Sequence, residues 1–297
     1  TAIHLQVHDM IVWRFPHDPL MPHLADAVPP QRVRHHLPYD QLPPGLDGPA
    51  DLLHLSAEPL KYYPENCCTV RYTLQWRGAD ALSPPQAMVI FGKTYRDDSG
   101  RAAHQRLQHY WRTAALKSCR PLGYDETIRT VWSLGVEGLP LAEVIARADH
   151  TPYLGLLGRG LAAVHASNPA ELGTLGAVAV SELLADFIKK IDKLSRACPP
   201  CAEPLALLVA PALAMGQRLA DGAPAGRALH GDFHIDQVLA HDGEVWLFDF
   251  DSFMLGDPEQ DLAGLHVRAF RVDPLQQDPG DPGPDLGRAG GRQAPHQ

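Results

Sequence analysis

The residues best suited to chemistry lie together at positions 228–263 of this chain, where the sequence reads ALHGDFHIDQVLAHDGEVWLFDFDSFMLGDPEQDLA. Two short apolar runs, at 238–239 and 244–248, flank a His-Asp-Gly turn at 241–243. An Asp-Gly pair between apolar runs is a strong signal for a β-hairpin. The two ends of a hairpin lie side by side, so residues before the first run and after the second are expected to meet.

Three oxygen-bearing side chains stand at these two ends, namely Asp232, Gln237 and Asp249. Carboxylate and amide oxygens suit a hard cation such as Mg²⁺, with phosphate oxygens completing its coordination shell. Asp232 need not bind a metal, because it could instead accept a proton from an attacking hydroxyl or orient that hydroxyl.

A different class of site uses His230, Asp232 and His234, which alternate with a period of two. On a strand these side chains would point to one side and could form the metal centre of a hydrolase. This interpretation explains neither the hairpin nor Asp249, so it is the weaker alternative.

The elements that must position these residues begin with a β-rich region at 57–97. Strands are expected at 59–63, 69–76 and 88–95, and the second places Val70, Tyr72, Leu74 and Trp76 on one face. The third strand reads MVIFGKTY and is apolar apart from Lys93. A lysine in such a strand must extend its ammonium to solvent or find a partner.

Helical patterning follows. A helix at 102–115 places Leu107, Tyr110, Trp111 and Ala114 on one face. Strands are expected near 123 and at 128–134, and then mainly helices as far as about 226. This order predicts an α+β architecture of two lobes. Residues 1–56 are interpreted as an extension that packs on the first lobe, and the Pro- and Gly-rich residues 271–297 as a disordered tail.

Composition narrows the class of protein. The chain has 26 Lys and Arg against 35 Asp and Glu, a formal net charge of −9, which argues against a nucleic-acid partner. Five cysteines cannot form a fully paired disulfide framework, and the single CxxC motif at 198–201 is interpreted as thiols in a polar loop. No apolar run is expected to reach the roughly 18 residues of a membrane span, and no signal peptide is recognised. We therefore expect a cytoplasmic protein that binds neither membrane nor nucleic acid.

Two motifs carry a family resemblance. HGDFHIDQVL resembles the HGDxHxxN catalytic loop of the aminoglycoside phosphotransferase and choline kinase-like superfamily. FDFDSFMLGDPEQDLA resembles the next motif of that superfamily, an (I/L)D(W/F)(E/D) element followed by GDPxxDLA. The resemblance covers residues 57–265. It implies a protein-kinase-like fold, with a β-rich N-lobe at 57–136, a helical C-lobe at 137–270 and ATP in the cleft between them.

The resemblance also implies roles for the motif residues. Asp232 would be the catalytic base, and Gln237 and Asp249 would bind Mg²⁺. Gln237 stands where the family usually has asparagine. His230 and Asp261 would support the catalytic loop without reacting.

Upstream, the resemblance assigns nucleotide contacts to the N-lobe. Lys93 would pair with the α- and β-phosphates. The strand 130–136 would lead to the adenine-binding hinge, which includes Leu134 and Val136. No glycine-rich phosphate loop is present, but the Thr69 hydroxyl could contact phosphate.

Three departures qualify the resemblance: the glutamine at 237, the absence of a glutamate between 101 and 111 to pair with Lys93, and the short chain after Ala263. Asp97, Asp98 or another group would have to replace the glutamate. Asp251, Asp257 and Glu259 are interpreted as a solvated acidic rim, or as groups that attract a cationic acceptor.

The expected function is an ATP- and Mg²⁺-dependent small-molecule kinase that phosphorylates a hydroxyl of an aminoglycoside, sugar or amino alcohol. The alternative outside active enzymes is a catalytically impaired pseudokinase or a truncated kinase-like fragment.

Overall fold

The computed structural model describes residues 2–5, 10–77, 84–112, 117–145, 151–172, 175–177, 180–221 and 226–269. The tail expected to be disordered, residues 271–297, lies outside the described residues.

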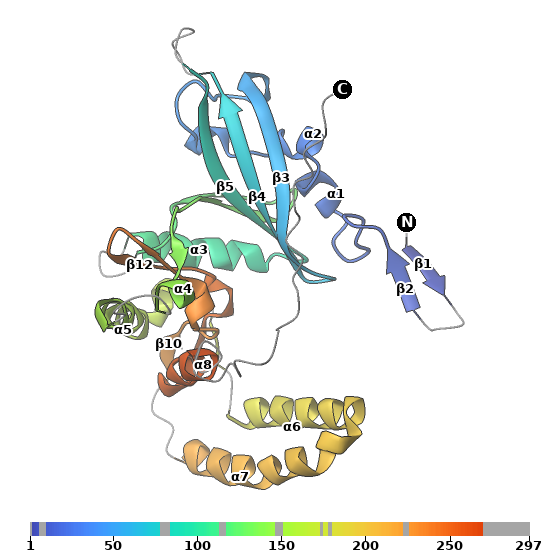
Figure 1. The fold of residues 1–297 in the computed structure, drawn as a ribbon, viewed down its shortest axis with the longest axis vertical. Coiled ribbons are helices and arrows are strands. Elements are labelled where there is room, and N and C mark those ends of the chain that lie inside the picture. The colour runs from blue at the N-terminus through green and yellow to red at the C-terminus, as the bar shows by residue number, and fades with distance from the viewer. Residues whose placement is uncertain are drawn as a thin grey trace, which may run out of the picture.

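A five-stranded antiparallel sheet forms the upper part of the molecule (Figure 1). In spatial order its strands are β3 (Leu52–Tyr63), β4 (Cys67–Trp76), β5 (Gln86–Tyr95), β7 (Thr130–Leu134) and β6 (Pro121–Asp125). The period-two pattern of β4 predicted its buried face correctly, since Val70, Tyr72, Leu74 and Trp76 are all buried. β3 begins seven residues before the strand predicted at 59. It lies at the edge of the sheet and has a bulge between Pro59 and Lys61, and an edge strand tolerates a proline.

Residues 15–46 of the N-terminal segment pack on one face of this sheet, whereas the first hairpin stands away from it (Figure 1). After the hairpin of β1 (Ala2–Leu5) and β2 (Met10–Trp13) come two short helices, α1 (Leu24–Ala27) and α2 (Pro30–Val33), and 3₁₀ turns at Tyr39–Gln41 and Pro49–Asp51. Met21 and Leu24 are fully buried against β4, and the hydroxyl of Tyr72 donates to the carbonyl of Ala27 at 2.7 Å.

Helix α3 (Ser99–Trp111) runs beneath the sheet (Figure 1). Leu107 and Tyr110 are buried as predicted, but the helix ends at Trp111, whose side chain is 44% exposed. The predicted face was therefore correct only as far as Tyr110, and Ala114 lies outside the described residues.

The lower part holds small sheets and helices around the two motifs. One sheet contains β8 (Leu139–Pro140), β11 (Val238–His241) and β12 (Glu244–Leu247), and the other contains β9 (Gly176–Ala177), β10 (Arg227–Leu229) and β13 (Met254–Gly256). The helices beside them are α4 (Leu141–Ile145), α5 (Thr151–His165) and α8 (Glu259–Ala269).

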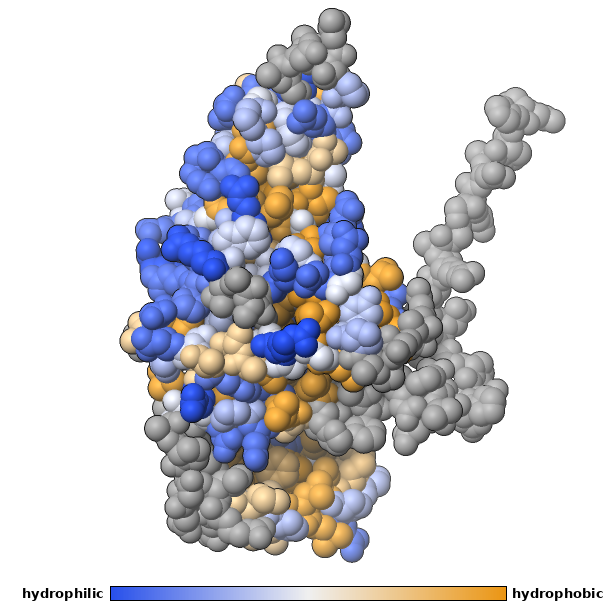
Figure 2. Space-filling view, turned by 90° about the vertical axis from the view of Figure 1, so that its left-hand side faces the viewer, coloured by the Kyte–Doolittle hydropathy of each residue, from blue (hydrophilic) through white to orange (hydrophobic). Residues whose placement is uncertain are grey.

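Two further helices, α6 (Val180–Ala197) and α7 (Ala202–Asp221), pack on each other at the lower end of the molecule (Figure 1). They leave apolar side chains such as Leu207 (72% exposed) in solvent, and Figure 2 shows an apolar surface at this end. The expectation that no apolar run reaches the length of a membrane span is wrong, because Pro199–Gly216 has the length and composition of one. Only 6% of this window is buried in the structure.

Candidate active site

The hairpin predicted from the Asp-Gly pair is present. β11 and β12 pair with Val238 opposite Leu247, and both Asp242 (φ 49°) and Gly243 (φ 74°) have the positive φ that a tight hairpin turn requires. The pairing continues past the strands, because the amide of Phe248 donates to the carbonyl of Gln237 at 3.0 Å. Gln237 and Asp249 therefore meet, with Gln237 Nε2 donating to Asp249 Oδ2 at 3.1 Å.

Asp249 holds an unusual backbone conformation. Its φ of 62° and ψ of 66° lie in the left-handed region, which few residues other than glycine adopt without strain. A 3₁₀ turn, Phe250–Ser252, follows directly. Burial raises the pKa of the Asp249 carboxyl, but the positive charge of Lys93 and hydrogen bonds from Lys93 and Gln237 outweigh it, so the pKa lies below its usual value.

Lys93 reaches this turn from β5. Its ammonium lies 2.7 Å from Asp249 Oδ1 and 2.7 Å from Asp251 Oδ2. Burial lowers the pKa of Lys93, but the two carboxylates more than compensate, so its pKa is raised and the side chain is charged. The interpretation of Asp251 as part of a solvated rim is wrong, because the side chain is held by Lys93 and by the hydroxyl of Tyr95 at 2.7 Å.

The acidic partner of Lys93 is therefore neither Asp97 nor Asp98. Asp97 lies beside Arg96, and Asp98 beside Arg129. The sequence has no acid from Ser99 to Trp111, but it has a buried arginine there, Arg106, which is 7% exposed.

Arg106 was not predicted as a site residue. Its Nη1 donates to the carbonyl of Asp251 at 2.8 Å and lies 3.4 Å from the carbonyl of Phe250, so α3 holds the turn after Asp249. The signal was an arginine on the face of the helix that also carries Ala103, Leu107 and Tyr110, since a buried guanidinium requires acceptors.

A cleft opens between the sheet and the turn at 249–252. One part, about 330 Å³, is lined by Thr69 and Lys93 from the sheet and by Gln237 and Asp249 from below. Thr69 is the register partner of Lys93 across β4 and β5. A neighbouring part, about 730 Å³, is lined by Leu134 and Val136. Phe91 lines both parts, which places the predicted phosphate contacts and the predicted hinge residues along one continuous region.

Asp232 stands on the loop that faces this turn. Its side chain is 52% exposed, with Oδ2 at 3.6 Å from His234 Nε2, and it does not line the cleft beside Lys93. The loop abuts the turn after Asp249 at Gly231, which has a φ of 83°. A Cβ at Gly231 would lie 2.0 Å from the carbonyl oxygen of Ser252, so only glycine fits there.

His230 and Asp261 hold the same loop from behind. Asp261 is 2% exposed and accepts hydrogen bonds at 2.9 Å from the amides of His230 and Gly231 and from His165 Nε2. His230 Nε2 lies 2.9 Å from the carbonyl of Phe248, so the buried imidazole joins the loop to the residue before Asp249. Burial lowers the pKa of His230, which keeps it neutral with its Nε2 proton donated to Phe248.

This geometry contradicts the hydrolase alternative. His230, Asp232 and His234 do not lie on a strand, because β10 ends at Leu229. His230 is fully buried, whereas Asp232 is exposed. Among the residues that the structure describes, no group of three or more His, Cys, Asp or Glu side chains could hold a metal ion by themselves.

Asp261→Asn is expected to lower the free energy of unfolding by about 2–4 kcal/mol at pH 7, because an amide cannot replace a buried carboxylate that accepts three hydrogen bonds. Burial raises the pKa of Asp261, but these hydrogen bonds lower it more, so its folded pKa lies below the value of about 3.9 in unfolded chains. The stabilisation is therefore complete above about pH 4 and lost as the pH falls through the folded pKa. Urea unfolding at several pH values measures this. An equal difference between wild type and variant at pH 7 and pH 2.5 would contradict it.

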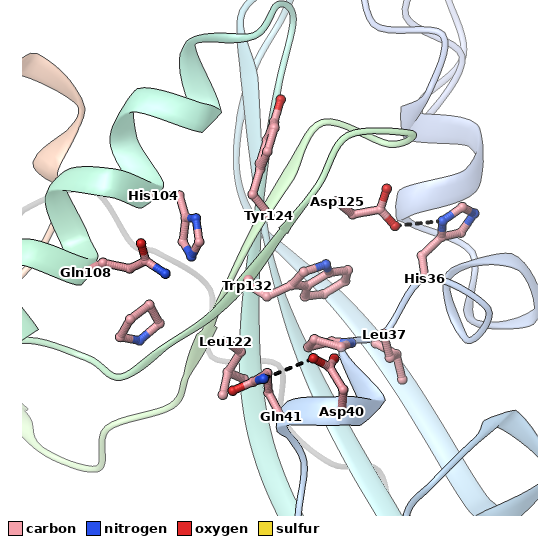
Figure 3. Close-up of a pocket in the computed structure, with 13 residues that line it drawn as sticks. His36, Leu37, Asp40, Gln41, His104, Gln108, Leu122, Tyr124, Asp125 and Trp132 are labelled. Atoms are coloured by element: carbon pink, nitrogen blue, oxygen red, sulfur yellow. Dashed lines mark hydrogen bonds and ion pairs between the residues drawn. The ribbon is translucent and has the colours of Figure 1, made fainter. Parts of the chain in front are cut away.

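A separate hollow of about 440 Å³ lies beside β6 at the outer edge of the sheet (Figure 3). His104 and Gln108 of α3 stand on one side of it, and His36 pairs with Asp125 on the other. It is not lined by Lys93, Asp232, Gln237 or Asp249. We therefore place the candidate active site in the cleft at Lys93.

Comparison with known proteins gives a consistent result. The model of a family described as "Phosphotransferase enzyme family" matches residues 90–292. No match was found among curated proteins. Among solved structures, the GDP and kanamycin complex of APH(2″)-IIia is 13% identical with a TM-score of 0.52, and the match covers 73% of this chain and 75% of that one. Aminoglycoside phosphotransferase APH(4)-Ia is 14% identical with a TM-score of 0.51, and the match covers 74% and 76%.

These structures confirm the two-lobed α+β kinase-like fold, and the family match confirms the resemblance drawn from the two motifs. The family match also confirms the expectation of a small-molecule kinase. The chain belongs to the phosphotransferase enzyme family.

Proposed function

We propose that the protein transfers the γ-phosphate of a purine nucleoside triphosphate, ATP in the first instance, to a hydroxyl of a small molecule. The observation that carries this proposal is the meeting of Lys93, Gln237 and Asp249 at one end of a cleft that also contains Leu134 and Val136. A nucleotide site requires a cationic group that binds the phosphates, oxygen ligands for the metal ion and an apolar surface that contacts the purine ring.

The donor set at the turn fits magnesium. The carboxylate of Asp249 and the amide oxygen of Gln237 are both hard ligands, and the two side chains meet through the 3.1 Å hydrogen bond from Gln237 Nε2 to Asp249 Oδ2. Asp249 is ionised because its pKa is lowered, so no proton has to leave before a cation binds. When bound, Mg²⁺ would neutralise negative charge on the phosphates.

The residues of the proposed site have separate roles. Lys93 binds the α- and β-phosphates, with Thr69 beside it, and exchanges its contact with Asp249 for these oxygens. Asp232, whose carboxylate is half exposed, accepts the proton of the acceptor hydroxyl. His230 and Asp261 keep the backbone of that loop in place. Catalysis in this arrangement is mainly positioning and charge stabilisation.

The acceptor proposed is an aminoglycoside, a sugar or an amino alcohol. APH(2″)-IIia, which has the same fold, binds kanamycin and GDP. Asp232 and Asp236 are exposed carboxylates at the edge of the candidate site, and the chain as a whole has a net charge of −9. Both features suit an acceptor with amino groups.

A thermal-shift experiment followed by a turnover assay tests the proposal. ATP or GTP is expected to raise the Tm in the presence of Mg²⁺ and much less in its absence, because a ligand that binds only the folded state stabilises it. Nucleotide consumption should then rise with at least one member of a panel of aminoglycosides, sugars and amino alcohols. No shift with either nucleotide would contradict the proposal. Binding without turnover would instead favour the catalytically impaired alternative.

A further inference from the structure

The ammonium of Lys93 has two carboxylate partners of equal distance, 2.7 Å from each. If one of these carboxylates binds a metal ion, the other must remain with Lys93 to keep the lysine paired. Asp249 lies beside Gln237 in space, and its second oxygen, Oδ2, accepts a hydrogen bond from the glutamine amide. The other carboxylate, Asp251, contacts Lys93 and Tyr95 instead.

Asp251 is held independently of Asp249. Its Oδ1 accepts the hydroxyl of Tyr95 at 2.7 Å, and its Oδ2 faces Lys93. Burial and the carboxylate of Asp251 raise the pKa of Tyr95, so this hydroxyl stays protonated and donates. The backbone of Asp251 is fixed as well, because its carbonyl accepts from Arg106.

Helix α3, beside the cleft, carries a positive side chain where kinases carry a negative one. Where a glutamate on α3 would pair with Lys93, the helix has a buried arginine and no acidic residue. The acidic partner, Asp251, lies instead on the turn at 249–252, two residues after Asp249.

We propose that Asp251 is the positioning residue for Lys93, taking the part that a helix glutamate plays in other kinases. This inference rests on the proposed function and deepens it. Asp251 keeps Lys93 directed at the phosphates when Asp249 turns to the metal, and it is not itself a metal ligand. The short turn Asp249–Ser252 then has two roles: its Asp251 holds Lys93, which binds the phosphates, and its Asp249 is the ligand of the metal.

The test compares Asp251→Asn with Asp242→Asn, which removes a carboxylate that is 88% exposed on the hairpin turn. Asp251→Asn is expected to lower kcat/KM for the nucleotide by about 10- to 100-fold. The Mg²⁺ concentration for half-maximal activity should stay within about twofold of wild type, whereas Asp249→Asn should raise it. Activity equal to that of Asp242→Asn, or a Mg²⁺ requirement raised as in Asp249→Asn, would overturn the proposal.

A second readout does not depend on turnover. The rate at which acetic anhydride modifies Lys93 at pH 9, followed by mass spectrometry without nucleotide, should rise in Asp251→Asn and not in Asp242→Asn, because Lys93 then loses one of the two carboxylates that hold its amino group at 2.7 Å. An unchanged rate would overturn the pairing even if the enzyme is active. A raised rate in a protein that transfers no phosphate would keep the pairing and reject the proposed function. Circular dichroism confirms that each variant is folded.

Discussion

Replacing Asp232 with asparagine is expected to lower kcat by about 10²- to 10⁴-fold while nucleotide affinity persists. The carboxylate is half exposed and does not line the cleft beside Lys93, so its loss removes a proton acceptor without removing a nucleotide contact. Asparagine has nearly the same shape, and therefore the loop between Gly231 and Phe233 should keep its structure. The measurement is steady-state turnover with an acceptor found in the panel, together with calorimetric nucleotide binding.

The matched control for this variant is Asp242→Asn, which removes a charge of the same sign from an exposed turn. Its kcat should stay within about twofold of wild type. Turnover in Asp232→Asn equal to that of the control would show that Asp232 is not the base. Loss of nucleotide binding in the same variant would show that its role is structural.

Replacing Asp249 with alanine should weaken Mg²⁺-dependent nucleotide binding by at least about 100-fold, because it removes the only charged member of the proposed ligand pair. Asp249 also has a positive φ, which alanine adopts less readily than aspartate or asparagine. Asp249→Asn therefore separates the two effects, since asparagine tolerates this conformation but has no negative charge. Calorimetric titration with ATP and GTP, with and without Mg²⁺, measures the affinity of each variant.

Both variants should bind nucleotide with little dependence on Mg²⁺. If Asp249→Asn retains the full Mg²⁺ dependence of wild type and only Asp249→Ala loses it, the effect is one of backbone conformation, and Asp249 is not the metal ligand.

The sequence was sufficient for features encoded by local patterns. The Asp-Gly pair predicted the β11–β12 hairpin and thus the meeting of Gln237 with Asp249, because a turn with two positive φ angles leaves few alternatives. The period-two pattern of β4 predicted its buried face in the same way. The apolar character of β5 around Lys93 indicated that this lysine would need a partner.

The sequence did not indicate which residue would pair with Lys93. Lys93 and Asp251 are separated by most of the chain, and an acidic residue after a strand is more often solvated than paired. Arg106 escaped for a related reason, since an arginine within an amphipathic helix gives no sign of the carbonyl groups it will meet. Similarly, the start of β3 depended on its place at the sheet edge, which is a property of the assembled sheet.

The central claim is Mg²⁺-dependent transfer of the terminal phosphate from a nucleoside triphosphate to the hydroxyl of a small molecule. The most direct measurement follows ³²P from γ-labelled ATP and GTP into a panel of aminoglycosides, sugars and amino alcohols, using wild type and Asp232→Asn. We predict labelled product with at least one acceptor, dependent on Mg²⁺ and lowered by about 10²- to 10⁴-fold in the variant. Labelled product formed equally by both proteins, or nucleotide hydrolysis with no label in any acceptor, would contradict the claim.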